Sequence, residues 1–190
     1  MTGDKDARRK RNMKWLAYIV AGVIAQTAII VVFVLLVMRI RNLKVRIDSV
    51  TVENVNVTSS SSSPSFNMKL TALVTVKNTN FGHFKFDDST ATISYRGAEV
   101  GEGTIPKARA KARSTRKLNI TVPVSSSKLS SNSGSLVSDI GSGILPLSSH
   151  AKLNGKIHLF KIFKKKKSAE MNCTMEVDTK KNVIQKLTCK

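Results

Sequence analysis

The sequence predicts a mostly β protein in which one N-terminal transmembrane helix precedes a single globular domain. Three observations lead to this fold class. Residues 15–38 contain no charged side chain, residues 44–122 largely alternate apolar and polar side chains, and residues 125–147 space their apolar side chains as a short helix does. Roughly 150 residues follow the apolar run, which is a usual size for one domain with one core.

The transmembrane helix is expected at Trp15–Met38. At about 1.5 Å per residue this helix is about 36 Å long, which exceeds the hydrocarbon thickness of about 30 Å. A cleaved signal peptide would have a shorter apolar region and a small-residue cleavage site, whereas Arg39-Ile40-Arg41-Asn42 follows here. We therefore predict an uncleaved signal anchor.

The basic residues around the anchor predict its orientation. Six Lys or Arg residues precede it and four follow closely, which favours a cytoplasmic N-terminus. Residues 1–14 are polar and basic, and we expect a disordered cytoplasmic tail. The rest of the chain would then lie on the lumenal or extracellular side of the plasma membrane or of a secretory-pathway membrane.

One face of the anchor carries small residues. Ala17, Ala21, Ala25 and Ala28 share this face, and Gln26 lies near the midpoint. Small residues let helices approach closely, and an amide in hydrocarbon gains from an interhelical hydrogen bond. The span is therefore a candidate contact for a homo-oligomer, and the alternative is a monomeric anchor.

The domain begins with two strands separated by a Ser-rich loop. Apolar side chains alternate over residues 44–57, with slips at Asp48-Ser49 and Glu53-Asn54 that predict bulges. A second strand follows from Phe66 to Val76. We divide the chain into a tail (1–14), the anchor (15–38), a membrane-proximal strand and Ser-rich loop (39–65) and the remainder of the domain (66–190), so that the whole domain covers about 44–190.

Turns and strands then alternate along the chain. A turn is expected at Asn78–Gly82, because Asn and Gly tolerate the positive φ that a chain reversal needs. Further turns are expected at Asp87–Ser89 and Arg96-Gly97. The remaining strands are expected at residues 84–86, 91–95, 98–105, 118–122 and 151–163.

A short amphipathic helix interrupts the strands. Leu129, Leu136, Val137, Ile140 and Ile144 recur at spacings near 3.6 within residues 125–147. Serine and glycine are poor helix formers, so packing must hold this helix, which we expect to end around residues 141–143.

The C-terminus predicts a hairpin with a disulfide. If Lys180-Lys181-Asn182 is a three-residue loop with Asn182 in the left-handed conformation, Thr179 faces Val183. Met175 then opposes Leu187, and Cys173 opposes Cys189 within bonding reach. We predict a disulfide, the alternative being two free thiols.

Three N-x-[ST] sequons begin at Asn56, Asn119 and Asn172. In each, the asparagine lies between two apolar neighbours, so it points away from the buried face of its strand. A glycan is tolerated there, which is consistent with translocation of the domain.

The domain is strongly basic. After the anchor, 26 basic and 10 acidic residues give a net charge of +16, which draws anionic partners. Anionic lipid and acidic polysaccharide are favoured over nucleic acid, because the anchor separates the domain from the cytosol and nucleus. The basic surface is expected on two loops, residues 107–117 and a tetralysine loop, with solvation as the alternative role: Lys107, Arg109, Lys111, Arg113, Lys164, Lys165, Lys166 and Lys167.

Catalytic and cofactor motifs are not found in the sequence. His83, His150 and His158 share no metal-ligand spacing with one another or with the cysteines. Asp87-Asp88 precedes Ser89 in a predicted turn, where aspartate commonly bonds its own backbone. No nucleophile elbow, P-loop or dinucleotide motif occurs. We expect no enzyme, no metal and no cofactor.

Residues 74–124, beginning VTVKNTNFGHFKFDDS, and the terminal MNCTMEVDTKKNVIQKLTCK resemble the plant late embryogenesis abundant hydroxyproline-rich glycoprotein family, which includes harpin-induced and non-race-specific disease resistance-like proteins. The family's Asn-Pro-Asn appears as Asn78-Thr79-Asn80, and its Tyr-Arg-Gly as Tyr95-Arg96-Gly97. The resemblance implies a fibronectin type III or immunoglobulin-like β-sandwich with one helix, a membrane-associated role in stress or defence, and no catalytic residues.

Two functions remain open from the sequence. The first is a membrane-anchored interaction module whose basic loops contact anionic headgroups or acidic polymers. The second is a lipid-binding or lipid-transfer domain in which the helix Leu129–Ile144 covers a hydrophobic groove between sheets. The weak helix propensity of that segment motivates the second function, because it would let the helix open.

Overall fold

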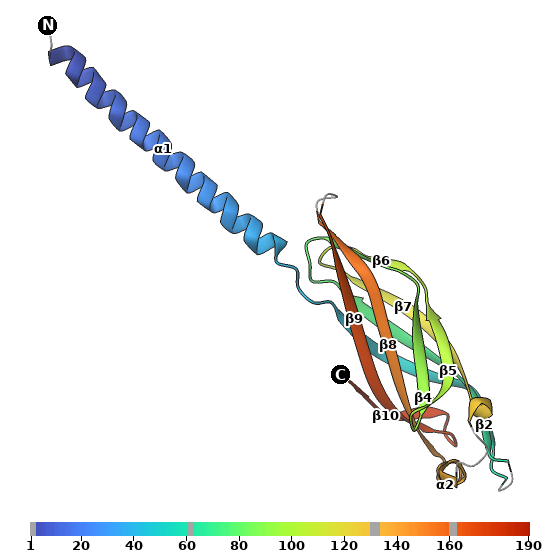
Figure 1. Cartoon of the computed structure of the whole chain (residues 1–190). Coiled ribbons are helices and arrows are strands. Elements are labelled where there is room, and N and C mark those ends of the chain that lie inside the picture. Colours follow the sequence, from blue (N-terminus) through green and yellow to red (C-terminus); the bar gives the residue numbers. More distant parts are fainter. Residues whose placement is uncertain (1–2, 61–62, 130–133, 160–162) are drawn as a thin grey trace. The chain divides into compact units, whose positions relative to one another are not determined.

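A computed structural model describes residues 3–60, 63–129, 134–159 and 163–190 of the chain. The chain consists of two units, Met1–Ile40 and Arg41–Lys190. The first unit is the helix α1 (Gly3–Met38), and the second contains all the strands (Figure 1).

Helix α1 is longer than predicted. Its segment Asn12–Leu36 has a mean hydropathy of 2.8 and no buried side chains, so its length and composition suffice to cross a membrane. The expectation of a disordered tail is wrong for residues 3–14, which continue the helix. This segment is rich in Lys and Arg, which are good helix formers.

One polar group of the span is bonded within its own helix. The hydroxyl of Thr27 donates to the carbonyl of Val23 at 2.7 Å. The role of the alanine face as a homo-oligomer contact stays a prediction.

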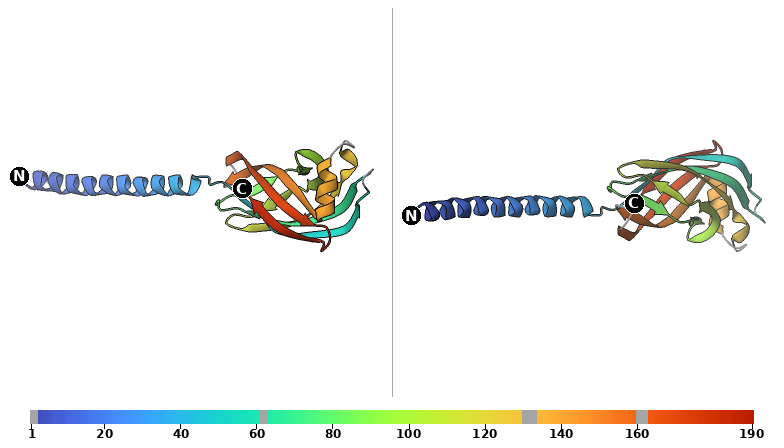
Figure 2. Two further views of the ribbon diagram at one scale, coloured as in Figure 1. Left: turned by 90° about the horizontal axis from the view of Figure 1, so that it is seen from below. Right: turned by 90° about the horizontal axis from the view of Figure 1, so that it is seen from above.

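The second unit is a ten-stranded, barrel-like sheet that curves around its core (Figures 1 and 2). Its main path runs β1-β2-β7-β5-β4-β8-β3-β6, and β9 joins the free edge of β8 and carries β10. All paired strands are antiparallel. The strands are β1 (Lys44–Thr58), β2 (Ser65–Lys77), β3 (His83–Phe86), β4 (Ser89–Tyr95), β5 (Ala98–Ile105), β6 (Ala108–Ala110), β7 (Thr115–Ser125), β8 (Ile144–Leu159), β9 (Phe163–Asp178) and β10 (Val183–Cys189).

The predicted alternation places the core correctly. Phe66, Met68, Leu70, Val74 and Val76 of β2 are buried, as are the alternate residues of β7. The two predicted slips in β1 are register shifts against β2, between Ile47 and Ser49 and between Glu53 and Asn56. Each shift lets an apolar face return to the core after an extra residue.

The β4–β5 hairpin confirms the predicted turn at Arg96-Gly97. Both residues have positive φ, 48° and 91°, and Tyr95 pairs with Ala98 across a two-residue loop. Positive φ at both central positions defines a type I′ turn, whose twist matches that of the flanking strands.

The second helix, α2 (Gly134–Ser142), is shorter than the apolar spacing predicts. Leu136 and Ile140 are buried. Leu129 follows a single 3₁₀ turn (Ser126–Lys128), and Ile144 already belongs to β8. The helix ends at Gly143, which has φ 83° and donates its N–H to the carbonyl of Asp139. Glycine adopts this C-terminal left-handed conformation without a Cβ penalty.

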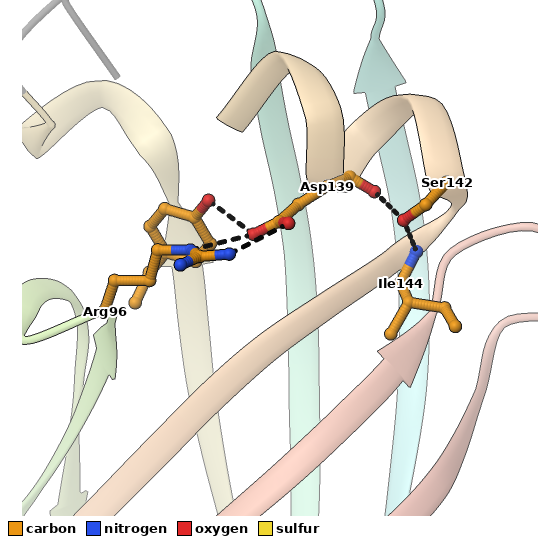
Figure 3. Close-up of polar contacts among 5 residues, drawn as sticks. Arg96, Asp139, Ser142 and Ile144 are labelled. Carbon is orange, nitrogen blue, oxygen red and sulfur yellow. Dashed lines mark hydrogen bonds and ion pairs between the residues drawn. The ribbon is translucent and has the colours of Figure 1, made fainter. Parts of the chain in front are cut away.

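An ion pair fastens α2 to the β4–β5 turn (Figure 3). Arg96 donates to both carboxylate oxygens of Asp139, at 3.0 and 3.1 Å, and the Tyr95 hydroxyl donates to Asp139 at 2.7 Å. Burial alone raises the pKa of Asp139, but the bonds from Arg96 and Tyr95 outweigh it and hold the pKa below its usual value. These bonds hold a helix of low intrinsic propensity in place.

The C-terminal hairpin confirms part of the predicted register. Asn182 has φ 56°, Met175 pairs with Leu187 and Cys173 pairs with Cys189. The predicted pairing of Thr179 with Val183 is wrong, because Val183 pairs with Asp178 and a register shift between Ile184 and Lys186 restores the expected partners.

Side-chain bonds explain this difference. The Asp178 carboxylate accepts the N–H groups of Lys180 and Lys181, each at 2.9 Å, which folds the turn back on itself. Thr179 instead donates its N–H to the carbonyl of Gly143. The two sulfurs of Cys173 and Cys189 lie 2.03 Å apart, at disulfide distance.

The β8–β9 hairpin corrects two further expectations. β8 begins at Ile144, so it starts before Pro146, and Lys164–Lys167 are residues of β9 rather than a loop. Lysine suits this position, because charged side chains protect an exposed sheet edge from pairing with another chain. The predicted continuation of the strand through residues 160–162 lies outside the described residues.

The mostly β class with one apolar N-terminal helix and one short helix is confirmed. The division into fibronectin type III or immunoglobulin-like sheets stays a prediction, since hydrogen bonds link the strands into one sheet.

Candidate functional site

Four basic side chains form a row across four neighbouring strands. Lys166 of β9 pairs with Lys156 of β8, Lys156 pairs with Lys85 of β3, and Lys85 pairs with Arg109 of β6. All four are exposed, whereas Phe84, Phe86 and Ile157 on the opposite face are buried. We call Lys166, Lys156, Lys85 and Arg109 the cation row.

A glycine permits this close arrangement. Gly155 of β8 lies against β3, and a Cβ at this position would meet the carbonyl oxygen of Lys85 and the ring of Phe84. The small residue therefore lets β3 pair with β8, which places Lys85 directly beside Lys156.

The cation row is electrostatically unfavourable by itself. Directly opposed like charges destabilise a sheet by roughly 0.2–1 kcal/mol per pair, and the row contains three such pairs. Among the described residues, none of the four cations is in an ion pair, while six basic residues elsewhere in the domain are. Asp87 lines the surface depression beside Lys156 and Lys166. The row can thus take a polyanion as its partner.

Two histidines lie beside the cation row. His83 and His158 are cross-strand partners, and their rings stack at 5.0 Å with an interplanar angle of 8°. Burial lowers the pKa of both, and nearby cations, among them Arg109 and Lys85, lower it further. These surroundings favour the neutral form of both rings.

The predicted basic surface is only partly gathered in this row. Arg109 and Lys166 belong to it, and Lys164 pairs with His158 beside it. Lys107, Lys111 and Arg113 are exposed outside it, while Lys165 and Lys167 share the opposite strand face. Lys167 donates to Asn42 at 3.0 Å.

The sequence does not indicate that Lys85, Lys156 and the paired histidines lie together. Their segments are 70 residues apart, and no local pattern pairs them. Alternation in the segments HFKF and GKIHL could have indicated which residues point outward, but not that these residues meet.

A buried asparagine pair holds the start of the domain. Asn78 donates its side-chain amide to the carbonyls of Gly82 and Lys111 at 2.8 and 3.0 Å, and its Oδ1 accepts two bonds from Asn80. Asn80 in turn bonds the N–H and the carbonyl of Arg41, at 2.6 and 3.0 Å.

The turn at Asn78–Gly82 forms for a different reason than the positive φ that the sequence predicts. Neither asparagine has positive φ, so their amide groups, not left-handed backbone, explain their presence. Only 1% and 3% of Asn78 and Asn80 is exposed. Buried amides need hydrogen-bond partners, and the two asparagines find them in each other and in the backbone. Their bonds hold Arg41, where the chain enters the domain, in place.

The interior contains a small apolar cavity of ≈ 50 Å³. Val45 and Ile47 of β1 and Ala169 and Met171 of β9 line one side of it. β1 and β9 lie next to each other without pairing in the described sheet. Ser149 also lines the cavity, and its buried hydroxyl lacks a hydrogen-bond partner among the described residues. Helix α2 does not line this cavity, so the cavity is not the helix-covered groove that the sequence predicts.

The other predicted site residues are placed as follows. The sequon residues Asn56, Asn119 and Asn172 are all exposed, and Asn172 also bonds the ring of His150. Within the described residues, no group of three or more His, Cys, Asp or Glu could hold a metal ion. The use of the sequons stays a prediction.

The chain resembles a known protein in sequence. The chain is 28% identical over 193 residues to Late embryogenesis abundant protein At1g64065 of Arabidopsis thaliana, covering 99% of this chain and 89% of that protein.

Two solved structures are distant. A crystal structure of a protein from Archaeoglobus fulgidus has 18% identity and a TM-score of 0.35, covering 65% of this chain and 96% of that one. The solution structure of a candidate late embryogenesis abundant (LEA) protein, At2g46140.1, has 13% identity and a TM-score of 0.32, covering 86% of each chain. With TM-scores below 0.5, neither enters the argument.

The family model described as "Late embryogenesis abundant protein" matches residues 73–175. The match includes the asparagine pair and all four members of the cation row, and it spans more than half of the chain. This chain belongs to the late embryogenesis abundant protein family.

Proposed function

We propose that this protein is a single-pass, membrane-anchored, non-enzymatic protein of the plant stress or defence response. Helix α1 anchors it with a cytoplasmic N-terminus in the plasma membrane or a secretory-pathway membrane. The β domain, with sandwich-like sheets and the harpin-induced type of sequence, lies on the lumenal or extracellular side and binds anionic lipid or acidic polysaccharide.

The cation row is the observation that carries this proposal. Four exposed cations face one another without acidic partners in the described domain, although the arrangement destabilises the sheet. A surface that retains such repulsion gains free energy when an anion neutralises it. The exposed sequon residues and the paired cysteines support an oxidising compartment for the domain.

Binding by the full-length chain tests the proposal. We would place it in nanodiscs of neutral phosphatidylcholine and measure its affinity for anionic vesicles and for polygalacturonate at increasing salt. The test variant is K85Q/R109Q/K156Q/K166Q. The control variant, R46Q/R116Q/K181Q/K190Q, removes the same charge from exposed positions elsewhere.

The row variant should lose affinity and most of its salt dependence. A basic residue near an anionic surface contributes about 1 kcal/mol, so four of them change affinity by roughly 100- to 1,000-fold. If both variants lose affinity equally, net charge alone explains binding. If the unaltered chain binds neither anion, the proposed function is wrong.

Lipid binding inside the domain is a second candidate, favoured by the apolar cavity and the unpaired hydroxyl of Ser149. A cavity of ≈ 50 Å³ is smaller than the roughly 150 Å³ that holds a benzene, so β1 would have to separate from β9 to admit an acyl chain. Extraction of a labelled lipid by the full-length chain, blocked by A169W at this seam, would support it. No extraction would exclude it.

A further inference from the structure

We propose that the end of the β domain that carries Phe81 and Phe163 docks on the lipid bilayer that α1 spans. The two rings enter the headgroup region, and the surrounding cations bind lipid phosphates. This inference rests on the proposed membrane anchoring and names the surface that faces the membrane.

Phe81 and Phe163 are exposed, unlike the other phenylalanines of the domain for which burial is described. Their exposed fractions are 54% and 53%, whereas Phe66, Phe84 and Phe86 are at most 2% exposed. An exposed aromatic ring gains free energy when it enters a membrane interface.

The two rings belong to the same end of the domain. Phe81 lies between β2 and β3, next to Gly82, whose backbone packs so closely on the carbonyl of His158 that a Cβ would not fit. Phe163 pairs with Leu159, the neighbour of His158, across the β8–β9 connection. In Figure 1 the end of β8 and the start of β9 lie at the end of the sheet opposite α2.

Cations surround both rings. The Arg113 guanidinium lies over the Phe81 ring, 5.0 Å from its centroid. Lys164 and Lys165 directly follow Phe163 and are exposed. Aromatic rings among basic side chains suit the boundary of an anionic bilayer, where rings reach the acyl carbons and cations meet phosphates.

The chain itself ties this surface to the anchor. Asn80, the neighbour of Phe81, holds both backbone groups of Arg41, and Asn78 fixes Asn80. Arg41 follows Met38, the last residue of α1, by three residues, a stretch that reaches at most about 11 Å. A bilayer crossed by α1 is therefore within reach of the Asn80 loop.

The opposite end of the sheet lies far from both rings. A strand of the length of β9 separates Phe163 from Asp178 by about 50 Å. Val183 pairs with Asp178, so a probe at Val183 reports on a surface that docking leaves free.

Tryptophan fluorescence in nanodiscs tests the docking. Trp15 is the only tryptophan, so it reports insertion of α1 in the natural chain, and W15F provides a silent background. F81W and F163W are introduced separately into that background. The matched control is V183W, at a position 46% exposed beside the β9–β10 turn. Each chain is placed in discs with brominated acyl chains, either neutral phosphatidylcholine or phosphatidylcholine with phosphatidylserine.

Docking predicts quenching of F81W and F163W in the anionic discs that is roughly threefold or more above that of V183W. Quenching should fall in neutral discs, and equal quenching there would overturn the role of the cations. If Trp15 is quenched while F81W and F163W match V183W, the docking is wrong and the anchor stands. If Trp15 is not quenched, the anchoring itself fails. Protection of the two new tryptophans from iodide by polygalacturonate, without quenching by brominated lipid, would assign the surface to an acidic polymer and overturn docking.

Discussion

Replacing Lys156 by glutamate should stabilise the β domain. Lys156 lies between Lys166 and Lys85, so K156E turns two repulsive pairs of the cation row into two attractive pairs. Each cross-strand charge pair contributes roughly 0.2–1 kcal/mol of either sign. Reversing two of them should raise the free energy of unfolding by about 1–3 kcal/mol at low salt.

Chemical unfolding of the full-length chain in nanodiscs, followed by the β-sheet circular dichroism, measures this effect. The gain should shrink in molar salt, because exposed charges are screened. K156Q should give about half the gain, since it removes the repulsion without adding attraction. R46E makes the same charge change at an exposed position outside the row and serves as the control. If K156E is no more stable than R46E, the four cations do not act as an electrostatic unit.

Three other changes probe the contacts that support this surface. N78A should destabilise the domain by about 3 kcal/mol or more, because it leaves the buried hydrogen-bond partners of the Asn78 amide unpaired. Thermal unfolding measures this loss, and an unchanged midpoint would contradict the network. D139N should destabilise by about 1–3 kcal/mol at pH 7. The fold lowers the pKa of Asp139, so the stabilisation by its ionised carboxylate is present above about pH 4 and is lost as pH falls through the folded pKa. The unfolding curves of D139N and the unaltered chain should therefore converge in acid. A stability difference that does not depend on pH would contradict the ion pair. The Cys173–Cys189 bond closes a loop with a sequence separation of 16, so its reduction should lower the free energy of unfolding by about 3 kcal/mol. If mass spectrometry shows both thiols alkylated before reduction, the bond does not form.

Patterns of local period predicted most of the fold. Alternation of side chains along β2 and β7 identified the buried residues, and the slips in β1 located its two bulges, because the two-residue period of a strand is visible in a single segment. The I′ turn at Arg96-Gly97 and the left-handed Asn182 were likewise local.

Features made by distant segments could not be predicted in this way. The cation row joins residues 85, 109, 156 and 166, whose pairing depends on the sheet order and on Gly155. Asn78 and Asn80 fit a turn by local sequence, but their amide partners lie some 30 to 40 residues away and are not visible in it. A run of four lysines is typical of a loop, whereas pairing with β8 makes this segment a strand.

Protease protection in sealed vesicles tests the anchored arrangement most directly. The full-length chain, tagged at each end, would be inserted into sealed vesicles and treated with external trypsin. With a cytoplasmic N-terminus, trypsin should cut the basic residues before Trp15, while the domain, rich in exposed lysines, should stay intact until detergent is added. Digestion of the domain with protection of the N-terminal tag would show the reverse topology. Release of the whole chain by an alkaline wash would show that α1 does not anchor it.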